Sequence, residues 1–298
     1  MKTLEQAHQE FNYEQLIQEQ LVGQPNAINA YIECCQRYVG QQKIALIWEG
    51  KNGESEQWSF EQLDVASAQL ANYFKSIGIQ VGDCIAGLLP RTPELLITIL
   101  ATWRIGAIYQ PLFTAFESKA IEHRVLTANT KLIVTNAEQR PKLNHVEVKH
   151  ILTVNAGINF TSNEADFWQE AEQQSDQCEA VLRSFDDDFL MMFTSGTTGL
   201  AKSVPVPLKA VLAFKGYMQH AVDLREDDSF WNLADPGWAY GLYYGITGPL
   251  SLGHSIIMDE RAFSVDHAVE VIKKYRVSNL TGSPTAFRMF FGFKEKFD

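Results

Sequence analysis

The segment TSGTTGLAK, residues 194–202, combines hydroxyl, glycine and lysine residues in a pattern that could bind an anion. Gly196 and Gly199 lack a Cβ atom, so the backbone can turn with positive φ and approach a ligand closely. Successive backbone N–H groups in such a turn form a concave anion site, and the hydroxyl groups add uncharged donors. Lys202 adds one positive charge. Because each of these groups donates a hydrogen bond or a positive charge, the segment predicts a loop that binds a polyphosphate.

A flexible Ser/Thr/Gly linker is the alternative interpretation of this segment. Such linkers rarely separate two apolar stretches and end in a lysine. The phosphate loop of the P-loop NTPases does not fit either, because it has glycine immediately before its lysine, where this chain has Ala201. The glycine spacing also differs from that of a dinucleotide-binding loop. The sequence therefore favours a phosphate loop of another kind.

The elements that must position this loop are predicted from apolar stretches separated by polar ones. Short apolar segments, read as strands, alternate with segments of helical periodicity, which predicts an α/β fold whose mostly parallel sheets are sandwiched by helices. Strands are expected at 84–89, 107–113, 131–136, 148–154, 189–194, 229–234 and 255–259, and helices at 26–38, 63–77, 92–104, 119–128, 208–220, 240–252 and 264–276. Ligands bind such sheets beyond the carboxyl ends of strands, which is where the loop lies.

Residues 43–78 predict a β-hairpin followed by a capped helix. KIALIW and EQWSF are strand-like, and the turn-rich EGKNGES separates them. Ser59 and Gln62 have the spacing of a capping box, in which the two side chains bond to each other's backbone N–H. Gly78 stands where a helix C-terminal glycine is expected.

The composition excludes several classes of protein. A chain of 298 residues with 46% hydrophobic and 20% charged residues is globular in type. Its net charge of −11 disfavours binding to nucleic acid or anionic lipid. The longest apolar run, LLITILATW, is too short to span a bilayer. The four cysteines form no C-x-x-C pair and the start has no apolar signal core, which predicts a cytoplasmic protein.

Other chemistry finds no support in the residue pattern. The seven histidines are scattered without the spacing of a zinc-binding helix, so no metal ligand is assigned. The acidic run SFDDDF, residues 184–189, is typical of a solvated stretch before a strand. A G-x-S-x-G nucleophile motif is absent from the sequence, which argues against a hydrolase.

TSGTTGLAK resembles the phosphate-loop signature of the AMP-forming acyl-CoA synthetases, members of the adenylate-forming enzyme superfamily. Three further segments resemble the acetyl-CoA-synthetase-like members, in the same order along the chain: LLPRTPELLITILATWRIGAIYQPLFTAFESKAIEHR, WNLADPGWAYG and LTGSPTAFRMF. The resemblance covers about residues 25–298. It implies that a carboxylate attacks the α-phosphorus of ATP, with Mg²⁺ sharing the phosphate charge, and that the thiol of coenzyme A then displaces AMP.

The resemblance also implies which residues form the site. Those expected to hold the β- and γ-phosphates of ATP are Thr194, Ser195, Gly196, Thr197, Thr198, Gly199 and Lys202, and a catalytic role is assigned to Thr194 and Lys202. Trp238, Ala239 and Tyr240 fall where the family lines its acyl pocket. Burial in the core is the alternative for Trp238, and Asp235 is expected either to cap the helix that follows or to orient a substrate.

The phosphate loop departs from the family pattern at several positions. Ala201 replaces the proline that usually precedes the lysine, and Ser203 replaces the glycine that usually follows it. The histidine often found shortly afterwards is absent, and Pro205 and Pro207 stand nearby.

By resemblance, residues 1–298 are part of an N-terminal adenylating domain, with a subdomain at 80–225 and a second, incomplete one at 25–79 plus 226–298. The family continues with a segment that binds adenine and Mg²⁺ and with a small C-terminal domain carrying a catalytic lysine, and neither is seen here. We therefore expect an inactive piece of an enzyme that activates a short- or medium-chain carboxylic acid.

Two alternatives stay open: a non-catalytic nucleotide-binding fragment, and an adenylating enzyme with another acid and another thiol acceptor. An unfinished sheet would also expose an edge that favours a homo-oligomer.

Overall fold

The computed structural model describes Gln6 and residues 12–155, 160–194 and 199–292. In these residues the largest sheet has seven strands in the order β7-β6-β5-β3-β4-β8-β9. Their bounds are β3 Cys84–Leu88, β4 Ile108–Pro111, β5 Leu132–Asn136, β6 His150–Val154, β7 Glu164–Asp166, β8 Asp188–Thr194 and β9 Lys202–Pro207. All neighbours are parallel except β8 and β9, which confirms the predicted mostly parallel α/β fold.

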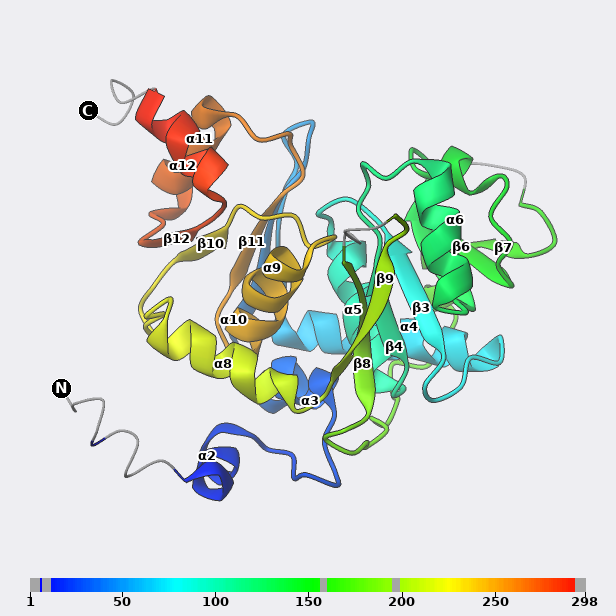
Figure 1. The fold of residues 1–298 in the computed structure, drawn as a ribbon, viewed down its shortest axis with the longest axis horizontal. Coiled ribbons are helices and arrows are strands. Elements are labelled where there is room, and N and C mark those ends of the chain that lie inside the picture. Colours follow the sequence, from blue (N-terminus) through cyan, green and yellow to red (C-terminus); the bar gives the residue numbers. More distant parts are fainter. Residues whose placement is uncertain (1–5, 7–11, 156–159, 195–198, 293–298) are drawn as a thin grey trace.

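Two smaller sheets lie beside it. β1 (Ile44–Glu49) pairs in parallel with β11 (Ile256–Asp259) and antiparallel with β2 (Ser55–Ser59), so the predicted hairpin is confirmed. β10 (Phe230–Asn232) and β12 (Asn279–Thr281) form a parallel pair. The second sheet thus joins an early segment of the chain to a late one (Figure 1).

Helices cover both faces of the large sheet (Figure 1). The longer helices are α2 Tyr13–Gln20, α4 Phe60–Ser76, α5 Pro93–Arg104, α6 Ser118–Thr127, α8 Ala210–His220, α11 Val265–Tyr275 and α12 Pro284–Gly292. The shorter ones are α3 Ala30–Cys34, η1 Gln36–Tyr38, η2 Arg140–Leu143, α7 Phe167–Glu172, α9 Ala239–Leu242, η3 Tyr243–Thr247 and α10 Gly248–Ser251. None of the described helices is long and apolar enough to cross a membrane.

The side-chain alternation of β3 shows how the layers are held. Ile85 joins the main core with α4 and α5, whereas Ala86 and Leu88 pack with Ile121 and Val125 of α6 on the opposite face. A strand buried on both faces in this way needs apolar residues at every position, as the sequence CIAGLL has.

Local sequence signals gave the correct ends of several elements. The capping box of Ser59 and Gln62 is formed at the start of α4. Thr92 and Pro93 open α5 as expected. Gly78 follows α4 with a φ of 84°, a conformation that glycine adopts without strain.

Other predicted elements need correction. The helix expected over 26–38 is broken at Cys35, whose φ of −141° and ψ of −66° separate α3 from η1. The helix expected over 240–252 is continuous but contains a π-helical turn, η3. The polar stretch near 160–180 contains β7 and α7, and residues 202–207 form β9 despite their two prolines.

Candidate functional site

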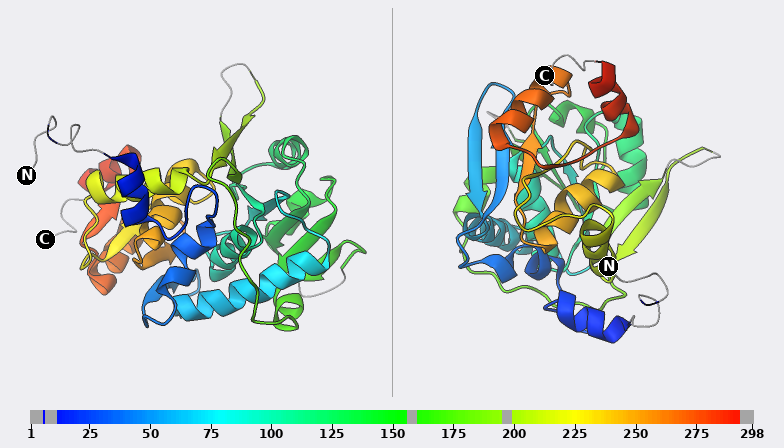
Figure 2. Two further views of the ribbon diagram at one scale, coloured as in Figure 1. Left: turned by 90° about the horizontal axis from the view of Figure 1, so that it is seen from below. Right: turned by 90° about the vertical axis from the view of Figure 1, so that its left-hand side faces the viewer.

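The predicted phosphate loop connects β8 to β9 in an antiparallel hairpin. Thr194 pairs with Lys202 at the last described position of the two strands, so the two residues flank the loop. β8 also pairs with β4 through Leu190 and Tyr109, which anchors the hairpin in the large sheet. Figure 2 shows the described part of the hairpin extending away from the body of the molecule. The loop therefore starts at the carboxyl end of β8, the strand next to the edge of the sheet, and ligands bind such sheets beyond the carboxyl ends of strands.

Four of the predicted phosphate-binding residues, Ser195 to Thr198, lie outside the described residues. The two that flank the loop, Thr194 and Lys202, have exposed side chains. Gly199 has a φ of 140°, and no atom lies within 4 Å of where its Cβ would be. The hydroxyl of Thr194 and the ammonium group of Lys202 are thus accessible to a ligand, beside a glycine whose backbone another residue would adopt only with strain.

The loop end of the hairpin is held to α6. His123 donates a hydrogen bond from Nε2 to the carbonyl oxygen of Ala201, over 2.8 Å. Its ring also meets the ring of Phe193 edge to face. Sequence reasoning gave His123 no role beyond packing, and this contact fixes the residue before Lys202.

The second predicted segment begins with a turn after β10. Asp235 accepts a hydrogen bond from the backbone N–H of Gly237 at 2.8 Å, and burial raises the pKa of this carboxyl group. The N-cap of α9 is Trp238, and no side chain caps that helix. The capping role considered for Asp235 is therefore wrong: its carboxylate shapes the Pro-Gly turn instead.

The Trp238 side chain lies on an aromatic surface rather than inside the core. It is 43% exposed, and its ring lies 5.5 Å, centroid to centroid, from both Phe113 and Phe116. A Cβ on Gly237 would stand 2.7 Å from the Cα of Phe113, so only glycine allows the two loops to approach this closely. The core alternative for Trp238 is thus excluded by its exposure.

Ala239 and Tyr240 continue inward from Trp238. Ala239 is partly buried and packs against the main core. The Tyr240 ring meets the Tyr244 ring edge to face, with the centroids 5.3 Å apart. Burial is the largest cause that raises the pKa of Tyr240, and the neighbouring Tyr217 raises it further. The Thr281 hydroxyl lowers it.

Tyr240 belongs to an aromatic group built by α8, α9 and η3. The rings of Tyr217 and Tyr244 stack with centroids 3.9 Å apart, and those of Phe214 and Tyr243 with centroids 4.3 Å apart. Sequence reasoning missed these neighbours. The signal was present in YGLYY, which places tyrosines three and four residues after Tyr240 and hence on its side of a helix.

A partly buried cation, Arg124, links the hairpin to the Trp238 segment. The guanidinium carbon of Arg124 lies 4.1 Å from the ring centroid of Phe116 and 5.6 Å from that of Phe193. Phe116 packs on Trp238, and Phe193 directly precedes Thr194. Arg124 was not identified from sequence, because nothing in IEHR shows that two aromatic rings from other segments will meet it.

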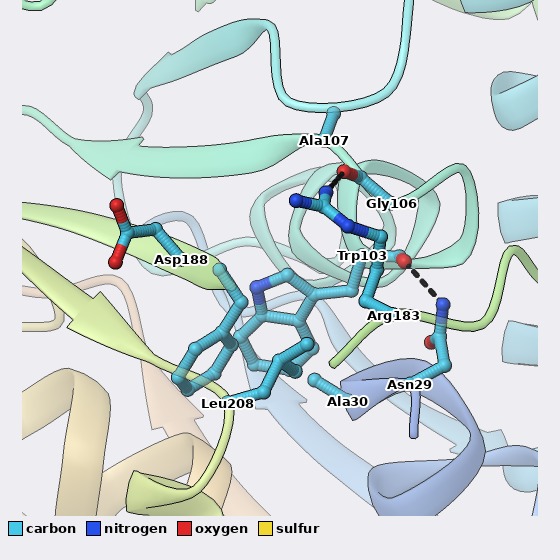
Figure 3. A pocket seen from close by; sticks show the side chains of 9 residues that line it. Asn29, Ala30, Trp103, Gly106, Ala107, Arg183, Asp188 and Leu208 are labelled. Carbon is cyan, nitrogen blue, oxygen red and sulfur yellow. Dashed lines mark hydrogen bonds between the residues drawn. The ribbon is translucent and has the colours of Figure 1, made fainter. Parts of the chain in front are cut away.

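The small cavity between α3, α5 and the start of β8 is a separate feature (Figure 3). Its volume is about 10 Å³, room for about one water molecule. Trp103 and Asp188 lie at this cavity, and Asp188 begins β8, whereas the phosphate loop follows its other end. Its size and place fit a structural role rather than substrate binding.

The residues that the structure describes do not gather three or more histidine, cysteine, aspartate or glutamate side chains into a metal site.

Comparisons with known proteins agree with this geometry. A family model described as AMP-binding enzyme matches residues 35–298. Acetyl-coenzyme A synthetase of Deinococcus radiodurans is 33% identical over 299 residues, which cover 90% of this chain and 45% of that protein. The acetyl-coenzyme A synthetase of Bacillus subtilis is 28% identical, over 98% of this chain and 52% of its own length.

A solved structure is similar over nearly the whole chain. The crystal structure of Brucella canis acyl-CoA synthetase has a TM-score of 0.95 and 46% sequence identity, covering 99% of this chain and 55% of its own. The chain spans about half the length of the curated relatives it matches. Since the family match covers most of the sequence and the fold and loop position agree with it, the chain belongs to the AMP-binding enzyme family.

Proposed function

We propose that the protein activates a short- or medium-chain carboxylic acid with ATP and transfers the acyl group to coenzyme A. The observation that carries the proposal is the pairing of Thr194 with Lys202 across the hairpin, at the carboxyl end of β8. The similarity to acetyl-coenzyme A synthetases and to an acyl-CoA synthetase supports this choice of reaction.

In the first half-reaction a carboxylate oxygen attacks the α-phosphorus of ATP, and the bond from that phosphorus to the pyrophosphate oxygen breaks. Negative charge grows on the leaving pyrophosphate. Donors from residues 194–199 and the ammonium group of Lys202 stabilise this charge without reorganising at the moment of reaction. Mg²⁺, when bound with ATP, would supply further positive charge to offset it.

In the second half-reaction the sulfur of coenzyme A attacks the acyl carbon, and the bond from that carbon to the AMP oxygen breaks. The thiol proton is lost and AMP leaves with the bonding electron pair. An oxide ion lost directly from the carboxylate would be a far poorer leaving group than AMP. The acid is therefore first converted to an adenylate.

The acid is proposed to bind at Trp238, Ala239 and Tyr240. The exposed Trp238 ring is proposed to form the entrance, with the small side chain of Ala239 beside it. The contact of Arg124 with both Phe116 and Phe193 supports a single site that joins acid and phosphate.

The sheet arrangement supports the division into two subdomains, 80–225 and 25–79 plus 226–298. The large sheet is built from residues 84–207, whereas the sheet of β1, β2 and β11 combines residues 44–59 with 256–259. We also propose a cytoplasmic location and, through an exposed sheet edge, a homo-oligomer.

The test is ATP–pyrophosphate exchange by the full-length protein, with acids from acetate upwards. Lys202→Ala should slow exchange by about 10²-fold, the usual cost of removing one preorganised charge-stabilising donor. Lys209→Ala is the matched control, because Lys209 is exposed and its ammonium group pairs with the exposed carboxylate of Asp186. Unchanged exchange by Lys202→Ala would remove the phosphate role, and ATP binding without exchange for any acid would favour the non-catalytic alternative.

A further inference from the structure

Two buried polar atoms beside the proposed acid site are poorly satisfied among the described residues: Asn232 Nδ2 has no hydrogen-bond partner, and Thr281 Oγ1 has only the nearby Tyr240 hydroxyl. Asn232 is only 8% exposed, and its Oδ1 already accepts a hydrogen bond from the Ala234 N–H at 2.8 Å. The amide N–H₂ of Asn232 is therefore left with two unused donors. Buried polar groups in native proteins are nearly always paired, so each exception calls for a partner.

The two atoms belong to one face of a sheet. Asn232 on β10 and Thr281 on β12 are register partners in the parallel pair, so their side chains point to the same side. Phe230, two residues before Asn232, shares that side and belongs to a small apolar cluster with Met218 and Leu224, against which Tyr217 and Tyr244 pack. This face of the β10–β12 pair therefore lies against α8 and η3.

The described part of η3 packs closely against Asn232, but its backbone supplies no hydrogen-bond acceptor for the Asn232 amide. A Cβ on Gly245 of η3 would lie 3.4 Å from Asn232 Nδ2. The Tyr244 ring stacks on that of Tyr217 and meets that of Tyr240 edge to face, so the three tyrosines lie together. The Thr281 hydroxyl adjoins the Tyr240 hydroxyl and lowers its pKa. We call Asn232, Thr281, Tyr217 and Tyr240 the polar wall.

The polar wall adjoins the proposed acid site through Tyr240, which lies two residues after Trp238 in the chain. Exposure falls from 43% at Trp238 to 8% at Asn232. In the acid site proposed above, a substrate tail directed inward from Trp238 and Ala239 points toward these hydrogen-bonding groups.

The wall is uncharged. Within the described part of the chain, no lysine or arginine donates a hydrogen bond to any of its four members. A second carboxylate placed there would be buried without a counter-charge, which is strongly unfavourable. A plain alkyl tail would leave the amide and hydroxyl groups unpaired, which also disfavours binding.

We propose that the polar wall binds a neutral oxygen substituent of the acid, so that the preferred substrates are hydroxy- or oxo-carboxylic acids of short chain length. An alcohol or ketone oxygen can accept from Asn232 Nδ2, and an alcohol can also donate to Thr281 or Tyr217. This inference rests on the proposed function and specifies its substrate class.

The test compares acids of one chain length in ATP–pyrophosphate exchange by the full-length protein: butyrate, 3-hydroxybutyrate, 4-hydroxybutyrate, 3-oxobutyrate and succinate. At least one of the hydroxy or oxo acids should exceed butyrate in kcat/KM by about tenfold or more, because a site built to hydrogen-bond a substrate rejects the analogue that lacks the group. Succinate should be the poorest substrate. Butyrate equal to or better than every oxygen-bearing acid would overturn the inference.

Two variants connect that preference to the wall. Thr281→Val and Asn232→Leu each keep the side-chain size and remove hydrogen-bonding atoms, so each should shift the preference toward butyrate by about tenfold. Thr161→Val is the matched control, because Thr161 is exposed and remote in sequence. If Asn232→Leu fails to fold, the nearly isosteric Thr281→Val still decides the question. An unchanged preference in Thr281→Val would contradict the assignment, whereas exchange with no acid at all would instead overturn the proposed function.

Discussion

The β8–β9 hairpin and the turn before α9 flank the same proposed site but are built in opposite ways. The hairpin presents exposed side chains, and Gly199 has open space around its Cα. At the turn, Gly237 touches the backbone of another loop, and Trp238 rests on two aromatic rings. Polyphosphate binding needs donors that can close on a ligand from solvent, whereas acid selection needs a wall whose shape is fixed before the acid arrives.

A matched pair of glycine substitutions tests this contrast most strongly. Gly237→Ala should lower the free energy of unfolding by about 2 kcal/mol, because its Cβ would stand 2.7 Å from the Phe113 Cα and force the loops apart. Gly199→Ala should cost about 1 kcal/mol, from backbone strain alone, because its Cβ would meet no neighbouring atom, but it should raise KM for ATP. Urea denaturation and exchange kinetics measure both quantities.

The opposite result, a destabilised Gly199→Ala and a stable Gly237→Ala with unaltered acid kinetics, would break the contrast between an open hairpin and a fixed turn.

Tyr240→Gly sharpens the account of the fixed wall. Removal of the ring opens space behind Ala239, so acid preference should move toward longer chains, by a few fold per added methylene. The readout is kcat/KM across a series of straight-chain acids. An unaltered profile would place Tyr240 in the core rather than in the acid site.

The smallest expected effect concerns the titration of the Asp235 carboxyl group in the turn before α9. Burial raises the pKa of Asp235 above its ordinary value of 3.8, so the folded state binds a proton more readily than the unfolded state. The contribution of Asp235 to the free energy of unfolding should therefore increase as the pH is lowered from neutral toward 3.8, and decrease as the pH is raised. Asp235→Asn keeps an oxygen acceptor for the Gly237 N–H and should remove this component of the pH dependence.

Thermal denaturation between pH 4 and pH 7 compares the two proteins. Parallel curves for Asp235→Asn and the unmodified protein would show that the carboxyl group titrates as it does in the unfolded chain.

Local signals in the sequence were sufficient for much of the fold. The capping pair Ser59 and Gln62 and the Thr92-Pro93 start specify their helices within a few residues of chain, so they could be recognised without the tertiary structure. The strand before the phosphate loop was recognised from its apolar run. These features depend on neighbours in sequence, and the structure confirms them.

The features that were missed depend on distant segments. β9 contains Pro205 and Pro207, which disfavour a strand unless it lies at the edge of a sheet, and only the topology reveals that edge. The packing of Phe113 and Phe116 on Trp238 joins residues more than a hundred positions apart. The poorly satisfied atoms of Asn232 and Thr281 could be recognised only once burial and register were known.

The two prolines of β9 also affect how the molecule behaves in a crowded solution. Pro205 and Pro207 are two residues apart, so both of their nitrogens face the same way, toward the open side of the strand. Because these proline nitrogens carry no hydrogen, β9 offers two fewer hydrogen-bond donors to a β-strand from another molecule at this edge. The prolines therefore disfavour edge-to-edge pairing of the projecting hairpin with another molecule.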